Sequence, residues 1–388
     1  MASPAPIVIV GAGMAAYGVA RELRKLDKTT PLLIISADAA HAYAKPMLSN
    51  AIALGKGAAQ LVSQTAAQMA LQLDAVVLAQ TRVLSIDSEQ RTLATERGNF
   101  SYSKLVLALG AQPIRLPMDG DAAGEVLSVN NLDDYAELRT RLDRVEGTAR
   151  VAIIGAGLIG CEFADDLLAG GHHVTLIDPN RHVLAALAAP SLSAGLAGAW
   201  SERTLELHLG TTAQAVTNAP GGLLVLLADG SSLACDLVLS AVGLRPSIAL
   251  AQASKLETRR GIVVDAHGQT SASDIFALGD CAEYTQDGVG TVLPYVAPLL
   301  AAARAIAATL AGTRTAIALK NDAVIVKTPS YKLALAPPPP GASGAWFDEH
   351  DGERTIARFI DDKGLLRGYG MSAHTPALRQ KLMGEMGG

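Results

Sequence analysis

The stretch IVIVGAGMAAYG, residues 7–18, determines how the rest of the chain is interpreted. An apolar run, a glycine-rich turn and an alanine-rich segment predict the strand, turn and helix that open a dinucleotide-binding βαβ unit. Gly11 allows the tight turn, Gly13 lets the backbone approach a pyrophosphate, and Ala16 stands where a third small residue keeps helix and strand close. The free N–H groups at the helix start then bind phosphate. Taken alone, the motif also fits a glycine turn in any α/β protein.

The motif occurs a second time in VAIIGAGLIGCE, residues 151–162, with Gly155, Gly157 and Gly160 all present. Two pyrophosphate-binding turns in one chain indicate two dinucleotides. The simplest chemistry that uses two is hydride transfer from a nicotinamide to a flavin, because each cofactor needs its own binding turn.

Length and charge narrow the class of protein. A chain of 388 residues predicts two or three domains. Charged residues make up 18% and the net charge is −5, which argues against nucleic acid as the main partner. The apolar runs are too short to span a membrane, and the N-terminal MASPAP lacks the pattern of a secretion signal. We therefore expect a cytoplasmic protein without a membrane partner.

The three cysteines, Cys161, Cys235 and Cys281, are far apart in the sequence and suit a reducing compartment. Many flavin enzymes pass electrons through a CxxC or CxxxxC pair, and this sequence contains neither spacing. Electrons are therefore expected to leave the flavin directly. Each cysteine is expected to be a small buried packing residue, and no metal site is expected.

Acidic residues follow the second strand of each βαβ unit. Asp38 comes after PLLIIS and Asp178 ends VTLID, near the spacing at which a carboxylate binds ribose hydroxyls. For Asp38 an ordinary turn aspartate is the alternative. Asp178 favours NADH because it repels the extra phosphate of NADPH, although Arg181 lies three residues further on.

Two further charged residues are candidates for the first cofactor. Lys45 lies in a predicted polar loop, HAYAKPMLSN, where it could neutralise a pyrophosphate; a solvated loop lysine is the alternative. Asp280 follows the short apolar strand IFALG, the usual place for a ligand contact in an open α/β sheet. A helix within residues 294–310, beginning near Pro298, would direct its positive end toward a reduced flavin.

The segments LVLALGAQP (105–113) and LVLSAVGLRP (237–246) resemble each other and are interpreted as two crossings between domains. This predicts an α/β fold with two Rossmann-like domains and a small α+β C-terminal domain. The FAD domain is discontinuous, 1–113 and 244–313, the NAD domain is inserted at 114–243, and the third domain is 314–388. Within the first domain, AVVLAQTRVLSID is expected to form one strand.

The region 314–388 contains the β-like AVIVKTP, the proline run at 337–340 and a hairpin signal around Asp351 and Gly352. Its aromatic residues, Trp346, Phe347 and Phe359, are expected to pack in a core rather than to form a binding surface.

Together these motifs resemble the flavin-dependent pyridine nucleotide oxidoreductases along essentially the whole chain. The narrower resemblance is to the rubredoxin reductases, and it is carried by short segments. They are YAKPMLSN, GAGLIGCEFADDL, SAVGLRP, FALGDCAE, YVAPLLAAARAIAATLAG and VKTP.

The resemblance implies a set of contacts to FAD and NAD(H). Those residues are Gly11, Gly13, Met14, Ala15, Asp38, Lys45, Pro46, Val83, Gly110, Asp280, Val296, Lys327, Gly155, Gly157, Leu158, Ile159, Gly160, Asp178 and Gly243. It also implies that Glu162 is the catalytic residue beside the nicotinamide and the flavin. Many ferredoxin-type relatives carry a lysine at the position of Asn50 that pairs with this glutamate, so here Glu162 must find another partner.

The implied function is NADH-dependent reduction of FAD followed by electron transfer to rubredoxin, a small acidic iron protein, in alkane hydroxylation. The alternatives are a reductase of ferredoxin, flavorubredoxin or oxygen, and, in a different class, a redox-sensing flavin-binding interaction protein. The oligomeric state stays open between monomer and homodimer. Weak candidates for a basic carrier dock are Arg115, Arg304, Lys320 and Lys332.

Overall fold

The computed structural model describes residues 4–286, 288–319 and 322–386, so Lys320 lies outside the described residues. The chain divides into two compact units. One comprises Met1–Lys45, Val62–Gln112 and Leu244–Lys320, and the other comprises Pro46–Leu61, Pro113–Gly243 and Asn321–Gly388. The division into three domains with the boundaries given above stays a prediction.

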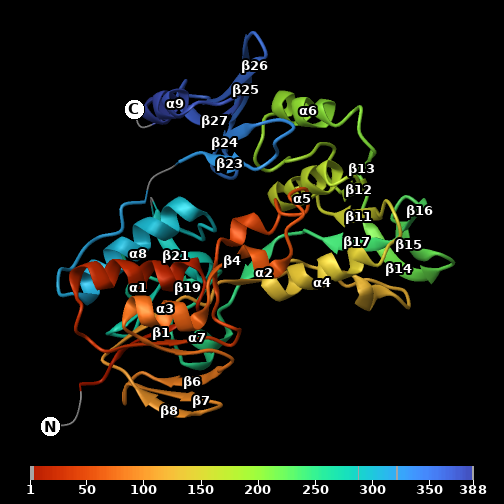
Figure 1. The fold of residues 1–388 in the computed structure, drawn as a ribbon. Coiled ribbons are helices and arrows are strands. Elements are labelled where there is room, and N and C mark those ends of the chain that lie inside the picture. Colours follow the sequence, from red (N-terminus) through yellow and green to blue (C-terminus); the bar gives the residue numbers. More distant parts are fainter. Residues whose placement is uncertain (1–3, 287, 320–321, 387–388) are drawn as a thin grey trace. The chain divides into compact units, whose positions relative to one another are not determined.

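The first unit is built on a five-stranded sheet in which every neighbouring pair is parallel. Its strands, in spatial order, are β20 (Ile275–Ala277), β9 (Lys104–Leu107), β1 (Ile7–Val10), β2 (Leu32–Ile35) and β5 (Val76–Leu78). The strands β20, β1 and β2 are fully buried, and β9 is buried from Leu105 to Leu107, as expected for a parallel sheet covered on both faces. The helices α1 (Met14–Leu26) and α8 (Val296–Leu310) pack against each other, and Figure 1 shows them side by side.

The remaining elements of this unit are short. They are β3 (Ala42–Tyr43), the 3₁₀ helix η1 (Lys45–Met47), β4 (Val62–Gln64), α3 (Ala66–Leu73), β6 (Val83–Asp87), β7 (Thr92–Thr95), β8 (Gly98–Ser101), β10 (Ala111–Pro113), β18 (Leu244–Pro246), α7 (Ala249–Ala253), β19 (Ile262–Val263), η3 (Gly279–Cys281), β21 (Ala282–Gln286) and β22 (Val289–Thr291). The two segments interpreted as crossings contain β10 and β18, which pair as a two-stranded sheet.

The expectation of a single strand over residues 75–87 is wrong. The chain forms β5 and β6, which belong to different sheets. Between them Gln80 adopts a left-handed conformation with φ 49°, and its N–H donates to the Asp38 carbonyl at 2.7 Å. This hydrogen bond turns the chain out of the parallel sheet and into the sheet β6-β7-β8.

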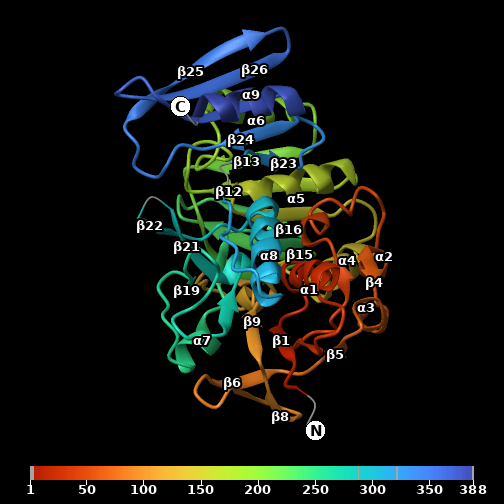
Figure 2. The same cartoon turned by 90° about the vertical axis from the view of Figure 1, so that its left-hand side faces the viewer.

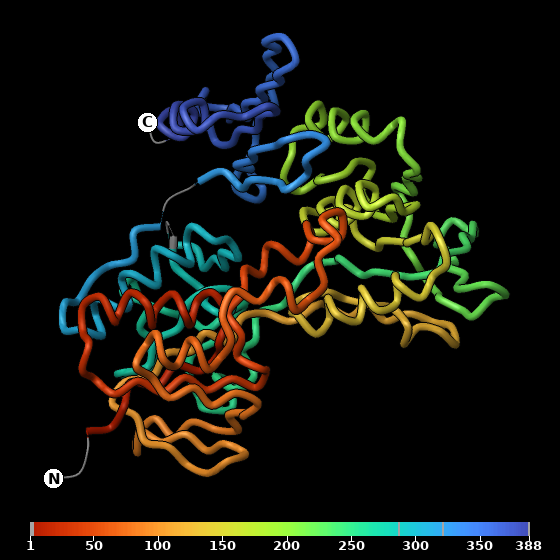
Figure 3. The backbone as a smooth tube through the Cα atoms, in the orientation of Figure 1, coloured from red at the N-terminus to blue at the C-terminus, as the bar shows by residue number. Residues whose placement is uncertain are grey.

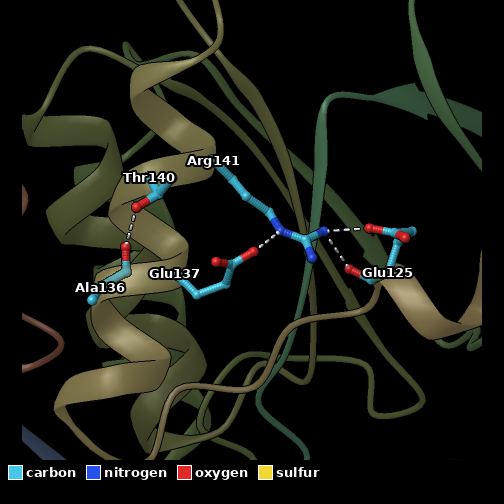
Figure 4. Close-up of polar contacts among 5 residues, drawn as sticks. All are labelled: Glu125, Ala136, Glu137, Thr140 and Arg141. Atoms are coloured by element: carbon cyan, nitrogen blue, oxygen red, sulfur yellow. Dashed lines mark hydrogen bonds and ion pairs between the residues drawn. The ribbon is translucent and has the colours of Figure 1, made fainter.

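The second unit contains a four-stranded parallel sheet with the order β13-β12-β11-β17. Its elements are α2 (Ala58–Leu61), η2 (Ala123–Glu125), α4 (Leu132–Asp143), β11 (Arg150–Ile154), α5 (Leu158–Ala169), β12 (His173–Asp178), α6 (Pro190–Ala199), β13 (Leu205–Leu209) and β17 (Leu237–Ser240). An antiparallel layer adds β14 (Ala213–Ala219), β15 (Gly222–Leu227) and β16 (Ser232–Cys235). In α4, Arg141 pairs with Glu125 and Glu137 at the surface (Figure 4).

The C-terminal part of the second unit is a five-stranded antiparallel sheet with one helix. Its elements are β23 (Val324–Val326), β24 (Leu333–Ala336), β25 (Gly344–Asp351), β26 (Arg354–Asp361), β27 (Leu366–Ser372) and α9 (Pro376–Met386). Helix α9 packs on β27 (Figure 1), and in the view of Figure 2 it lies between the labels of β26 and β24, the two strands that flank β27 in the sheet. The predicted α/β class, with two Rossmann-like sheets and a small α+β part, is confirmed.

The aromatic residues of this sheet do not share one environment. Phe359 is 7% exposed and meets Trp346 edge-on with ring centroids 5.4 Å apart. Phe347 is 59% exposed, so the expectation that it packs in the core is wrong. Strand alternation explains this, because neighbouring residues of β25 point to opposite faces and β25 is the edge strand.

Candidate functional site

The first glycine turn has the geometry of a pyrophosphate-binding turn. Gly11 has φ +114°, and a Cβ there would lie 2.3 Å from the Ala108 carbonyl oxygen, so only glycine fits. Gly13 is the N-cap of α1, and a Cβ on it would meet no described atom of the chain within 4 Å. The first turn of α1 is uncharged and begins with Met14 and Ala15. Open space in front of free helical N–H groups suits a bound phosphate.

The second turn repeats this geometry. Gly155 has φ +105°, with the Ala241 carbonyl oxygen 2.7 Å from a would-be Cβ. Gly157 again borders space that is open among the described residues. At Gly160 a Cβ would lie 1.9 Å from the Gly155 carbonyl oxygen, so this position accepts no side chain without moving the turn. Both turns therefore fit a dinucleotide.

The two carboxylates that were predicted to bind ribose, Asp38 and Asp178, accept hydrogen bonds from backbone and side-chain groups near them. Asp178 is 8% exposed; Oδ2 accepts from the Ala156 N–H at 2.7 Å, and Oδ1 accepts from the backbone and amide nitrogens of Asn180. Asp38 is exposed and accepts from Ser36 Oγ and the Ala40 N–H. A role for either in binding ribose stays a prediction.

Lys45 and Asp280, predicted separately from distant segments, lie close together in the first unit. Their Nζ and Oδ2 atoms are 3.9 Å apart. Lys45 opens η1, and Asp280 is the middle residue of η3, directly after β20. An ammonium and a carboxylate at one edge of a parallel sheet give both signs of charge for orienting a ligand.

The other predicted cofactor contacts occupy element ends and turns. Gly110 and Gly243 have positive φ values in the turns before β10 and β18, and Val296, 39% exposed, begins α8. Helix α8 begins before Pro298 because proline in the first turn of a helix removes no intrahelical hydrogen bond. Pro46 is in η1, Val83 begins β6, and Leu158 and Ile159 begin α5. Their roles toward a cofactor stay predictions.

Glu162, the predicted catalytic residue, is 1% exposed and is bound by two segments of the second unit. Its Oε2 accepts from Ser49 Oγ at 2.6 Å and from Lys327 Nζ, and its Oε1 accepts from the Lys327 N–H at 3.1 Å. The Asn50 side-chain amide donates to the Ser49 carbonyl oxygen. The partner that the sequence required for Glu162 is thus Lys327, which lies 165 positions away.

Two more carboxylates of α5 bind the same two segments, and sequence reasoning missed both. Asp165 is 1% exposed and accepts from Trp200 Nε1 at 2.7 Å and from the Ser330 N–H at 3.3 Å. Asp166 accepts from the N–H groups of Ile52 and Ala53 at 2.8 and 3.0 Å, while burial raises the pKa of its carboxyl. Figure 3 shows the 46–61 segment in red-orange and α5 in olive-yellow. The acidic pair in FADDL was the available signal.

The cysteines are free and buried, as predicted. Burial raises the pKa of Cys281 to about 11 and that of Cys235 to about 12, and it also raises the pKa of Cys161. The three thiols are therefore protonated near neutral pH. Among the described residues, no group of three or more histidine, cysteine, aspartate or glutamate side chains could hold a metal ion. No helix in the described ranges is long and apolar enough to cross a membrane.

Comparison with known proteins identifies the class. The model of the family "Pyridine nucleotide-disulphide oxidoreductase" matches residues 5–321, and the chain belongs to this family. It is an oxidoreductase whose cofactors are FAD and NAD(H). Residues 316–386 match a second family model, "Rubredoxin binding C-terminal domain".

Individual relatives cover nearly the whole chain. The "Rubredoxin-NAD(+) reductase" of Alcanivorax borkumensis is 43% identical over 382 residues, which is 98% of both chains. The "Nitric oxide reductase FlRd-NAD(+) reductase" of Aeromonas hydrophila is 38% identical over 96% of both chains. A solved covalent complex of putidaredoxin reductase with putidaredoxin is similar with a TM-score of 0.89 and 25% identity, over 99% of this chain and 93% of that one.

Proposed function

We propose that this protein is an NADH-dependent flavoprotein that passes electrons through FAD to rubredoxin. The observation that carries the proposal is the match of residues 316–386 to a rubredoxin-binding domain, in a chain that also contains two dinucleotide-binding turns. The similarity to rubredoxin-NAD(+) reductase over the full length supports it. When bound, FAD accepts electrons in a pair from NADH and releases them singly, which lets a two-electron donor serve a one-electron iron carrier.

In this proposal the protein binds and orients rather than acting as a nucleophile. The α1 turn at Gly11 and Gly13 holds the FAD pyrophosphate, and Lys45 and Asp280 flank the cofactor. The α5 turn at Gly155, Gly157 and Gly160 holds NADH, and Asp178 supports that turn through the Ala156 N–H. Positioning of two rings is enough to accelerate hydride transfer, because the protein pre-organises the approach.

The C-terminal part contributes a charge as well as a docking surface. Lys327 immediately follows β23, inside the matched rubredoxin-binding domain, and contacts Glu162 near the start of α5. We propose that this ammonium lies against the flavin, where a positive charge stabilises the electron-rich reduced ring. Glu162 then orients the ammonium and neutralises it in part.

The carrier is tested by sequential mixing without oxygen. NADH is expected to bleach the yellow FAD absorbance of the purified protein, and oxidised rubredoxin added next is expected to restore it. A flavin that NADH bleaches but rubredoxin leaves reduced would reject rubredoxin as the carrier. Slow or incomplete bleaching would instead favour a redox-sensing interaction protein.

A second candidate carrier is flavorubredoxin, because relatives near 38% identity are named as reductases of a nitric oxide reductase. Turnover measured with rubredoxin, flavorubredoxin, ferredoxin and oxygen at equal concentrations ranks the four acceptors. We propose the cytoplasm as the location, which three free buried thiols suit, and alkane hydroxylation as the pathway.

A further inference from the structure

Ser49 is placed between the two charges of the Glu162–Lys327 pair. Its side chain is buried, 3% exposed, and its Oγ donates to Glu162 Oε2 at 2.6 Å. Lys327 Nζ donates to the same Oγ at 3.4 Å. A hydroxyl has one proton to donate and two lone pairs. This arrangement therefore fixes the direction of the hydroxyl, whose O–H points to the Glu162 carboxylate and whose lone pair points to the Lys327 ammonium.

The backbone that carries Ser49 is itself anchored to α5. Asp166 accepts the Ile52 and Ala53 N–H groups, three and four residues after Ser49. On the other side, Asp165 accepts the Ser330 N–H, three residues after Lys327. The carboxylates of one helix thus hold both segments that reach Glu162, and the hydroxyl is kept at a fixed place between them.

The lysine needs such a constraint more than the glutamate does. The Lys327 side chain is 28% exposed, whereas that of Glu162 is 1% exposed. A lysine ammonium is a compact point charge on a flexible four-carbon stem, and water competes for its donors. Without the hydroxyl, the Glu162 carboxylate would be the remaining hydrogen-bond partner of Nζ among the residues that the structure describes.

We infer that Ser49 is a positioning residue that fixes the Lys327 ammonium and thereby sets the charge presented to the flavin. The inference rests on the proposed function, in which Lys327 lies against FAD. It assigns a role to Ser49, which the proposed function leaves without one. In this chain the ammonium comes from the C-terminal part, and the Ser49 segment supplies the hydroxyl that fixes it.

The test measures the FAD midpoint potential of the holoenzyme in four forms: wild type, Ser49→Ala, Lys327→Met and the double variant. Removing the lysine charge is expected to make the potential more negative, because the reduced ring loses its stabilising cation. Ser49→Ala is expected to shift the potential in the same direction by a smaller amount. In the Lys327→Met background, Ser49→Ala is expected to add no shift, since residues that act through one another are not additive.

Ser191→Ala is the matched control. Ser191 Oγ also joins α6 to the C-terminal sheet, through an exposed hydrogen bond to Asp348 Oδ1 at 2.9 Å, and neither Glu162 nor Lys327 takes part in it. Its potential is expected to equal that of the wild type. An unchanged potential in Ser49→Ala or in Lys327→Met, or an equal Ser49→Ala shift in both backgrounds, would overturn the inference. A failure of the proposed function gives a different result. In that case NADH does not reduce the FAD of the wild-type protein, or rubredoxin does not reoxidise it.

Discussion

Gly13 and Gly157 differ from their neighbouring glycines because each borders open space rather than the backbone of another strand. Gly13 has φ −77° and ψ −172°, which alanine adopts without strain. We therefore expect Gly13→Ala to leave the stability of the FAD-free protein unchanged or slightly raised, by up to about 1 kcal/mol. FAD affinity is expected to fall by about tenfold or more, because the new methyl group occupies the space proposed for the FAD pyrophosphate. Equilibrium titration of FAD into the stripped protein measures this.

Gly124→Ala is the matched control, since a Cβ there also meets no described atom within 4 Å and the residue belongs to η2 rather than to a glycine turn. Its FAD affinity is expected to equal that of the wild type. Equal FAD affinity in Gly13→Ala and the wild type would show that the open space at Gly13 does not hold the cofactor.

At single positions, sequence reasoning works best where the constraint is local. Gly11 and Gly155 were predicted from spacing alone, because a glycine turn between strand and helix is encoded in a few adjacent residues. The Lys327 partner of Glu162 was not, because the two residues are 165 positions apart and only packing brings them together. Asn50 showed that the usual partner is missing, but it carried no information about the replacement.

Among the elements, α5 follows the second glycine turn and carries carboxylates that accept hydrogen bonds from two segments distant in the sequence. Asp165 accepts from the indole N–H of the fully buried Trp200. We expect Asp165→Ala to lower the free energy of unfolding by about 1–3 kcal/mol, because a buried donor is left without a partner. The double variant with Trp200→Phe is expected to regain part of this loss, since it removes that donor. Urea denaturation of the FAD-free variants measures both.

Arg141→Ala provides the comparison for Asp165→Ala at the surface of the same unit. Arg141 contacts Glu125 and Glu137 (Figure 4), and both carboxylates are exposed. Its loss is expected to change the free energy of unfolding much less and to matter least at high salt, which screens exposed pairs. An equal loss in Asp165→Ala and Arg141→Ala would contradict the structural role given to the α5 carboxylates.

The elements themselves were predicted unevenly, for physical reasons. The apolar residues of β1, β9, β11 and β17 are all buried, so the sequence pattern and the environment agree. The split of β5 from β6 was missed because a polar residue at φ 49° has no distinctive sequence signal. Exposed Phe347 was missed because burial depends on which strand lies at the edge of a sheet, and the sequence does not order the strands.

At the scale of the whole molecule, the reactivity of the thiols distinguishes electron transfer directly from the flavin from electron transfer through a pair of cysteines. Because burial raises the pKa of Cys281 from 9.0 to about 11, the thiol is protonated at pH 8 and reacts poorly. We expect iodoacetamide at pH 8 to leave the native holoenzyme unmodified and its rubredoxin turnover unchanged. In urea, where burial is lost, all three cysteines are expected to react, as mass spectrometry would show. The raised pKa of Cys281 also contributes to the free energy of unfolding below about pH 9, and this contribution is lost as the pH rises through about 11. Inactivation that accompanies alkylation of the native protein would indicate a thiol in the electron path, which the separation of three buried cysteines otherwise excludes.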